Sequence, residues 1–166
     1  MHRHFADFDT FLVELVRDRT ARLDAPARAL SDAAGTGRVV DNLSHALTAV
    51  FTPLAVAMVA LVITRDGLRA RLREAGVSRF PLIAEGSAMV TAYLTAEQAR
   101  GRVAATADIS TLSHTLIGSV HLLFTDQDDG PPGTEELRKV ITGVMRGGQP
   151  GSGETGKGRL QPSASA

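Results

Sequence analysis

The chain has 166 residues, which is enough for one domain with a hydrophobic core and too few for two large domains. Its 18 basic and 18 acidic residues give a formal net charge of zero, which argues against nucleic-acid binding by this chain alone. Cysteine is absent, which excludes disulfides, thiolate metal sites and a cysteine nucleophile. The polar start lacks the apolar core of a signal peptide, so we expect a cytoplasmic protein.

The first element that the sequence predicts is an amphipathic helix over residues 8–23. Apolar side chains recur there at helical spacing, and charged residues occupy the opposite face. Asp7 is placed to cap the start of this helix, and Pro26 marks its end or a kink. Residues 31–37 (SDAAGTG) have the composition of a loop.

Two further helices are predicted on either side of Thr52 and Pro53. Residues 38–51 show helical periodicity, and Thr52-Pro53 forms an N-cap and N1 pair that begins the next helix. Residues 54–63 include no polar side chain, so we expect this helix to be enclosed on most sides. A membrane-spanning helix needs about 20 apolar residues. The apolar run here is interrupted by Thr48, Thr52 and Pro53, so a buried core helix is favoured over a membrane span.

The stretch around which the other helices are expected to pack is residues 79–103. A short charged helix over 64–75, which ends at Gly76, precedes it. Pro81 suits the first turn of the central helix, and Gly101 suits the position just beyond its C-terminus. Its apolar stripe predicts a central wall in an all-α domain.

The last two helices are separated by an acidic break rich in Pro and Gly at residues 126–133. Asp108 or Ser110 is expected to cap a helix over 111–124. Thr134 is expected to cap the final helix, which ends at the glycines 147–148. No strand pattern appears, so the sequence predicts an all-α fold.

Residues 149–166 are rich in Gly, Ser and Pro, which is typical of a disordered tail. Residues 151–156 match GxGxxG, and residues 151–157 match most of a phosphate-binding loop. That loop requires Ser or Thr after its lysine, but Gly158 stands there. It also requires a preceding strand and a following helix, and the sequence predicts neither. The match is therefore interpreted as a chance occurrence in a low-complexity segment.

The histidines are the next candidates for chemistry. His114 and His121 lie seven residues apart on one face of their predicted helix, but there is no HExxH motif and no third ligand at a useful spacing. They are interpreted as polar groups at a pocket wall or subunit interface, and His45 is expected to line the same interior. No Ser/His/Asp constellation or carboxylate pair appears, so we expect no catalytic residue, metal or cofactor, and no enzyme.

Two segments carry a resemblance to a known family. Within residues 2–12, the pattern His4, Phe5, Asp7, Asp9, Phe11 and Leu12 resembles the end of the DNA-binding domain in TetR-family transcriptional regulators. The segment over 93–103 (YLTAEQARGRV) is similar to effector domains of actinobacterial members. The family's Tyr falls at His2, and its phosphate-contacting Lys falls at Phe8.

The resemblance implies a division of the chain into three parts. Residues 1–7, with His2, Arg3 and His4 assigned to DNA binding, would be the end of a helix-turn-helix head. Residues 8–146 would bind an effector and dimerise, and residues 147–166 would be the tail. The helix-turn-helix head itself would precede Met1, so operator DNA is an expected partner only if that head exists upstream.

The resemblance also implies an antiparallel helical bundle and a homodimer that binds a small apolar or amphipathic effector. The effector would tilt the first helix and weaken operator binding, as in a repressor. The expected effector-lining residues are Phe11, Leu15, His45, Thr48, Met58, Met89, Tyr93 and His114. The expected dimer residues, which would build a four-helix bundle, are Leu116, Ile117, Val120, His121, Phe124, Leu137, Val140, Ile141 and Val144.

An alternative from another class is a helical module without DNA binding, which dimerises with other proteins or sequesters a ligand. The neutral net charge favours it. A small all-helical enzyme has the least support, because a polar catalytic cluster is missing from the sequence pattern.

Overall fold

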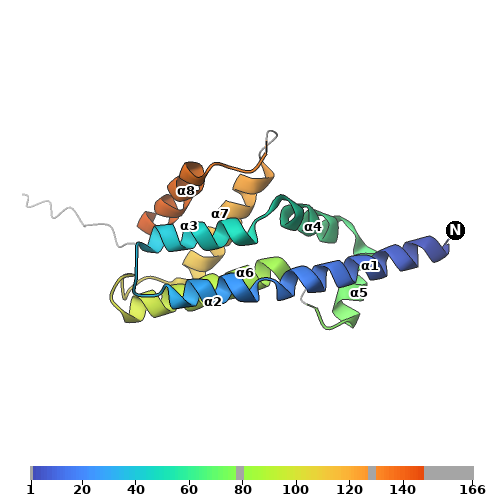
Figure 1. Ribbon diagram of the computed structural model, residues 1–166, viewed down its shortest axis with the longest axis horizontal. Helices are drawn as coiled ribbons and strands as arrows, with labels where there is room; N and C mark the ends of the chain where they lie inside the picture. Colours follow the sequence, from blue (N-terminus) through green and yellow to red (C-terminus); the bar gives the residue numbers. More distant parts are fainter. Residues whose placement is uncertain (1, 78–80, 127–129, 148–166) are drawn as a thin grey trace, which may run out of the picture.

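The computed structural model describes residues 2–77, 81–126 and 130–147, and within these ranges every regular element is a helix (Figure 1). The all-α expectation is therefore confirmed. The elements in chain order are α1 (His2–Ala21), α2 (Asp24–Asp32), α3 (Val39–Val50), α4 (Pro53–Thr64), α5 (Asp66–Glu74), α6 (Pro81–Ala99), α7 (Ile109–Thr125) and α8 (Thr134–Gly147).

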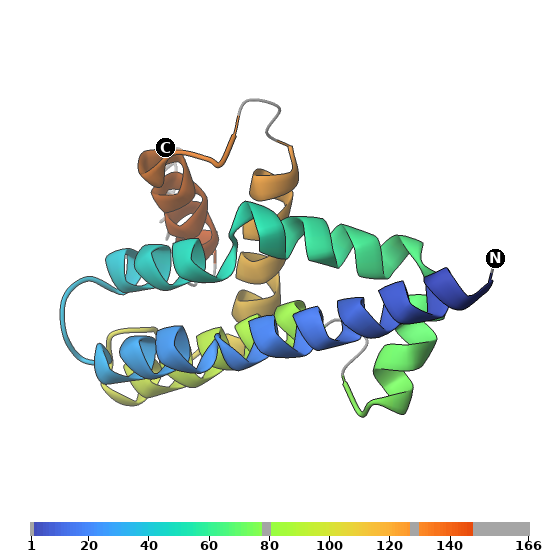
Figure 2. The ribbon, with the colours of Figure 1, turned by 45° about the vertical axis from the view of Figure 1, so that its right-hand side comes forward.

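Helix α6 is the central wall that the sequence predicted. It packs against α1, α2, α3 and α7. Figures 1 and 2 show α1 and α2 following one another along the length of the molecule, with α6 beside them and α7 crossing towards α8. The approach of these helices is close at Gly86, because a Cβ there would lie 3.3 Å from the Cδ1 atom of Ile117. A side chain at this position would require the Ile117 side chain to shift.

Several helix ends form as local sequence predicts. The side chains of Thr52 and Asp108 each accept a hydrogen bond from the backbone N–H three residues later, at 3.2 and 3.1 Å. Gly76 and Gly101 adopt φ values of +70° and +73° at the second position beyond α5 and α6. The backbone hydrogen bonds that follow, Val77 N–H to residue 72 and Arg102 N–H to residue 97, close both helices with the motif that favours glycine.

The N-terminal helices differ from the expectation in their bounds. Helix α1 begins at His2 rather than at residue 8, so Asp7 lies inside the helix and is not its cap. Helix α2 includes Pro26 and extends to Asp32, into a stretch that was predicted as loop. Pro26 is the third residue of α2, where a helix does not need its N–H, so it is compatible with the helix instead of ending it.

Helix α4 is less enclosed than its composition suggested. One face, formed by Ala55, Met58, Val59 and Val62, is buried where α4 packs against α5 and α7. Leu54 and Ile63 are 39% and 47% exposed. Because the helix is apolar on all sides, its sequence cannot show which face the neighbouring helices cover.

Among the described residues, no single helix has both the length and the apolar character to cross a membrane. Helices α3 and α4 meet those two criteria together, with a bend of 64° between them. Residues 149–166, with their predicted disorder and their GxGxxG match, lie outside the described residues.

Candidate functional site

The expected effector-lining residues fall in several separate places. Met58, Met89 and Tyr93 are buried in the hydrophobic core, with 4%, 7% and 1% of their surface exposed. Leu15 is half-buried at the edge of that core. These four therefore belong to the hydrophobic core or its edge, on α1, α4 and α6.

The other four expected residues lie at the surface. Phe11 is 58% exposed on α1 and stacks on Phe8, with 6.4 Å between ring centroids. His114 is exposed on α7, and its Nδ1 lies 2.7 Å from a backbone oxygen of its own helix. His45 and Thr48 are exposed on α3. The structure therefore does not bring the eight residues together around one cavity.

His45 and Thr48 instead line a groove of about 420 Å³ between α3 and the start of α8. Across this groove, a guanidinium nitrogen of Arg138 lies 2.9 Å from a carboxylate oxygen of Asp41. Ser44 and Thr134 add hydroxyl groups to its walls. The groove is thus polar and already contains a paired charge, which suits a solvated seam between helices more than an apolar ligand.

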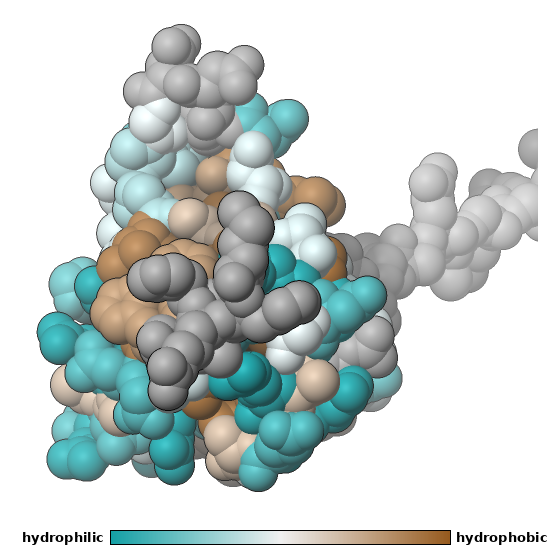
Figure 3. All heavy atoms as spheres, turned by 90° about the vertical axis from the view of Figure 1, so that its right-hand side faces the viewer, coloured by the Kyte–Doolittle hydropathy of each residue, from teal (hydrophilic) through white to brown (hydrophobic). Residues whose placement is uncertain are grey.

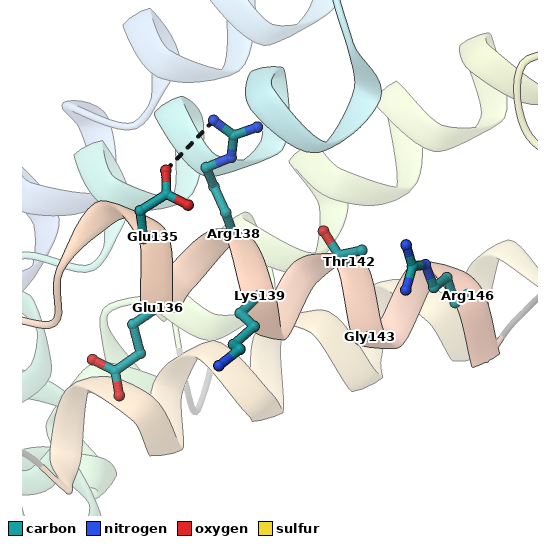
Figure 4. Close-up of a pocket in the computed structure, with 7 residues that line it drawn as sticks. All are labelled: Glu135, Glu136, Arg138, Lys139, Thr142, Gly143 and Arg146. Carbon is teal, nitrogen blue, oxygen red and sulfur yellow. Dashed lines mark ion pairs between the residues drawn. The ribbon is translucent and has the colours of Figure 1, made fainter.

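A larger concavity of about 750 Å³ runs along the outer face of α8 (Figure 4). All the described residues that line it come from this one helix, namely Glu135, Glu136, Arg138, Lys139, Thr142, Gly143 and Arg146. Glu135 and Arg138 pair with each other at 3.7 Å, which is the dashed line of Figure 4. A ligand on this face would meet charges of both signs on a single helix, so the concavity defines no specific chemistry.

A network of polar contacts surrounds the buried side chain of Glu97 near the end of α6. This carboxylate has no exposed surface. Its Oε1 accepts a hydrogen bond of 3.0 Å from the backbone N–H of Gly35, and its Oε2 lies 2.8 Å from Nε of Arg102. The Arg102 N–H does not point well at Oε2, so this second contact is an ion pair without an aligned hydrogen bond.

Tyr93 and Asn42 extend this network by one helical turn. The Asn42 side chain donates to the Tyr93 hydroxyl at 2.9 Å and to the backbone oxygen of Thr36 at 2.9 Å. Burial raises the pKa of Tyr93 to about 12, although the hydrogen bond from Asn42 opposes this rise and Glu97 adds to it. The phenol therefore stays neutral over the physiological range.

Residues 93–103 also hold the loop that follows α6. The side-chain amide of Gln98 donates to the backbone oxygens of Ala104 and Ala107, at 2.9 and 3.0 Å. Arg102 also donates to the backbone oxygens of Thr36 and Gly37. The segment that resembles an effector-domain motif thus fastens two loops, 33–37 and 102–107, to the end of α6.

Helix α1 is anchored at its N-terminal half to the corner between α4 and α5. Arg65, at this corner, donates to a carboxylate oxygen of Asp9 at 2.8 Å, and its guanidinium lies 5.4 Å from the centroid of the Phe8 ring. Arg71 of α5 donates to the hydroxyl of Thr10 at 3.1 Å. Further along, α1 packs against α6. A shift of α5 or α6 would therefore move α1.

Figure 3 looks onto the end of the molecule that carries the N-terminus, and it shows hydrophobic residues on this surface among hydrophilic ones. The large exposed apolar side chains of α1 and α4 are Phe8, Phe11, Leu54 and Ile63. Sequence reasoning placed Phe11 in a pocket because it lies on the apolar stripe of α1. That stripe is wider than the part that the other helices cover.

The expected dimer residues divide into two groups. The protomer itself buries Leu116, Ile117, Val120, Leu137 and Ile141, each with 2% exposure or less. These five have almost no surface left for a second chain, so they are not placed to form a dimer interface. A dimer that uses α7 and α8 would have to use the faces of these helices that remain exposed. The remaining four, which keep partial exposure, are His121, Phe124, Val140 and Val144.

His121 lies between the core and the surface of α7. Its ring centroid is 6.1 Å from that of Phe51, and its Nδ1 is buried without a hydrogen-bond partner among the described residues. Burial lowers the pKa of His121 below its ordinary value. The neutral imidazole is therefore the form that this environment favours.

The side chains of His2, Arg3 and His4, which were expected at a DNA-binding junction, lie outside the described part of the structure. Within the described part, no group of three or more His, Asp or Glu side chains is placed to hold a metal ion. Comparisons with protein-family models, curated proteins and solved structures found no match to this chain.

Proposed function

We propose that the chain is the effector-binding and dimerisation part of a ligand-responsive transcriptional regulator of the TetR type, acting as a repressor. The observation that carries the proposal is the anchoring of α1. This 20-residue helix starts at one end of the molecule and is fastened to the α4–α5 corner through Asp9 and Arg65. A DNA-binding head that preceded residue 1 would continue directly into α1.

The proposed switch is a tilt of α1. An effector that enters beside α4 and α6 would shift the α4–α5 corner, and the Asp9–Arg65 contact would carry this shift to the start of α1. The effector must bind the tilted state more tightly than the other state, because a ligand with equal affinity for both shifts nothing. In a dimer, the tilt would change the spacing of two heads and so weaken binding to paired half-sites.

The interior near Met58, Met89 and Tyr93 supports a small apolar or amphipathic effector. Met side chains adapt to different shapes because they are unbranched and flexible. The only polar group that Tyr93 brings to this interior is its hydroxyl, which Asn42 already contacts. The effector would therefore be held mainly by apolar contact, as is usual in ligand pockets.

The proposed homodimer uses the outer surfaces of α7 and α8. Leu122 is 67% exposed there, and a Cβ added at Gly118 or Gly143 would meet no atom within 4 Å. Half-buried Val140 and Val144 border Gly143 on the same helix. Small residues allow two helix pairs to approach closely, so a four-helix bundle between two chains is the expected arrangement.

The experiment that tests the proposal isolates the protein from its native cells with an antibody raised against this chain and sequences the DNA that it carries. A regulator of this type would enrich a short sequence with two-fold symmetry. Recovery of no DNA above the background of an unrelated antibody would contradict DNA binding. That result would favour the alternative, a helical dimerisation or ligand-sequestering module, which is consistent with the zero net charge.

A further inference from the structure

A cleft of about 280 Å³ lies among the start of α3, the loop after α6, the start of α7 and the end of α8. Figures 1 and 2 show the start of α3 and the end of α6 at the end of the molecule opposite to the N-terminus of α1. None of its residues belongs to the effector-lining or dimer sets considered above. The cleft is therefore a separate candidate for ligand binding.

The floor of the cleft is apolar. It is formed by Val39, Val40, Val103, Ala104, Leu112 and Met145. Val103 and Leu112 are 7% and 6% exposed, so they belong to the hydrophobic core and give the floor a fixed shape. An apolar ligand group placed here would leave water at little cost to the protein, because the surrounding side chains are already packed.

The rim of the cleft carries three arginines, Arg38, Arg102 and Arg146, and no acidic residue lines it. The carboxylate of Asp41 is 3.9 Å from exposed Arg38, and no described carboxylate pairs with Arg146. Arg102 is held in place by Glu97 and by the 33–37 loop. Arg146 is thus available for a ligand anion, and exposed Arg38 is held only by its 3.9 Å contact with Asp41, next to a third guanidinium group that is fixed.

The start of α3 adds to the positive character of this site. Its N-cap residue, Arg38, provides no side-chain acceptor for the first backbone N–H groups of the helix. These N–H groups and the helix dipole favour an anion at this position, and Asp41 in the first turn offsets part of that dipole. Arg38, Val39 and Val40 line the cleft at that helix end, so the apolar floor and the positive rim meet there.

From the apolar floor and the arginine rim together, we infer that this cleft binds a small amphipathic carboxylate, with its apolar body on the floor and its carboxylate at Arg38 and Arg146. Guanidinium groups bind carboxylates through paired charge-assisted hydrogen bonds. The volume of about 280 Å³ lies just below the range of roughly 300–1,000 Å³ for ligand pockets, so the ligand is small. A purely inorganic anion would leave the floor uncovered, and a neutral apolar molecule would leave the guanidinium groups without a partner.

The test uses octanoate as the probe, with the whole chain observed by two-dimensional NMR and by calorimetry. Octanoate is expected to bind with a Kd on the order of 1 mM or tighter. It should shift amide signals of residues 38–40, 102–107 and 145–146. Octan-1-ol has the same tail without the charge, and acetate has the charge without the tail, so both should bind at least roughly fivefold more weakly.

Arg38→Gln and Arg146→Gln remove charges at the rim without touching the core. Each should weaken octanoate binding by roughly two- to fivefold, as expected for exposed ion pairs. Arg28→Gln is the matched control, because Arg28 is an 80%-exposed arginine on α2 that does not line the cleft. It should leave the affinity unchanged, and circular dichroism should show the same fold for all three variants.

Equal binding of octanoate and octan-1-ol, or equal affinity in Arg38→Gln, Arg146→Gln and Arg28→Gln, would overturn the inference. Shifts confined to α1, α4 and α6 would overturn it as well, since they would place the probe in the interior of the proposed effector site. The inference does not rest on DNA binding, so its failure and the failure of the proposed regulator are separate outcomes.

Discussion

The buried carboxylate of Glu97 lies 2.8 Å from Nε of Arg102, five residues further along the chain and beyond the end of α6. Between them, Gly101 turns the backbone with a φ of +73°, so that the Arg102 side chain returns to the helix it follows. The pair also receives the N–H of Gly35, which belongs to a loop far away in sequence. One charge pair thus joins three segments and fixes one wall of the arginine-rimmed cleft.

Replacing Glu97 with Gln should destabilise the fold. The amide still accepts from the Gly35 N–H, but Arg102 loses its carboxylate partner and keeps only its backbone acceptors. Breaking a buried ion pair costs about 3–5 kcal/mol, and the 30% exposure of Arg102 reduces this to roughly 2–3 kcal/mol of unfolding free energy. Urea denaturation followed by circular dichroism measures the loss. Glu74→Gln, an exposed change on α5, is the control and should stay within about 0.5 kcal/mol of the parent chain. A Glu97→Gln variant as stable as this control would show that the network holds little of the fold.

The ionisation of Tyr93 can be observed directly, because it is the only tyrosine and tryptophan is absent. Ultraviolet absorbance should show tyrosinate forming at a pKa of about 12 in the folded chain and near 10 in urea. Because the folded value is the higher one, this contribution to stability is complete below pH 10 and is lost as the pH rises towards 12. A midpoint near 10 in protein that circular dichroism shows to be folded would contradict the burial of this hydroxyl.

His121 should make stability fall on mild acidification. Its folded pKa lies below the unfolded value of about 6.5, so the unfolded chain takes up a proton first as the pH falls. The stability that the neutral ring contributes is present above about pH 6.5 and is lost as the pH falls through the lower folded value. In His121→Phe, the unfolding free energy measured from pH 7.5 to 5 should therefore decline less steeply. His45→Gln controls for the removal of a histidine, and an equal flattening in that variant would exclude His121 as the source.

The contact between Asp9 and Arg65 should determine how firmly α1 is held. In Asp9→Asn, amide hydrogen exchange in the first half of α1 should become several-fold faster, since a partly buried charged hydrogen bond of about 1 kcal/mol is lost. Asp18→Asn is a matched control on the same helix, because Asp18 pairs only with Arg22 of α1 among the described contacts. Equal exchange in both variants would mean that the α4–α5 corner does not hold α1.

A change at Leu122 tests the dimer surface. Light scattering after size-exclusion chromatography should give the parent chain twice its 17.5 kDa mass, and Leu122→Glu should return it to a single chain. Because Leu122 is 67% exposed, the substitution leaves the core intact. Ile63→Glu places the same charge at an exposed site on α4 and should remain dimeric. A monomeric parent, or loss of the dimer only in Ile63→Glu, would place the interface elsewhere.

The helices and several of their ends could be predicted from the sequence because local signals determine them. Thr52 and Asp108 cap their helices because each has a side-chain oxygen three residues before a backbone N–H that lacks a partner in the helix. Gly76 and Gly101 end theirs because glycine tolerates a positive φ. The prediction that Pro26 ends or kinks a helix was wrong, because proline is acceptable in the first turn of a helix as well as beyond its end. The composition of residues 31–37 is typical of a loop, so it did not indicate that α2 continues to Asp32.

The candidate sites were less predictable because they depend on which helices meet. The stripe of α7 shows that Leu116 and Val120 share a face, but it does not tell whether the partner is α6, α8 or another chain. The contact between Glu97 and Gly35 spans 62 residues, and no periodicity in either segment indicates it. The arginine-rimmed cleft draws on four segments, so it appears only once they are assembled.

Finding where the native protein begins is the most direct test of the proposed regulator. Mass spectrometry of its N-terminal peptide, together with the in-frame DNA upstream of Met1, answers this. The proposal predicts a basic segment of three helices, with a helix-turn-helix, that continues into α1 at His2. A native N-terminus at Met1 would contradict it and leave a helical dimerisation or ligand-binding module.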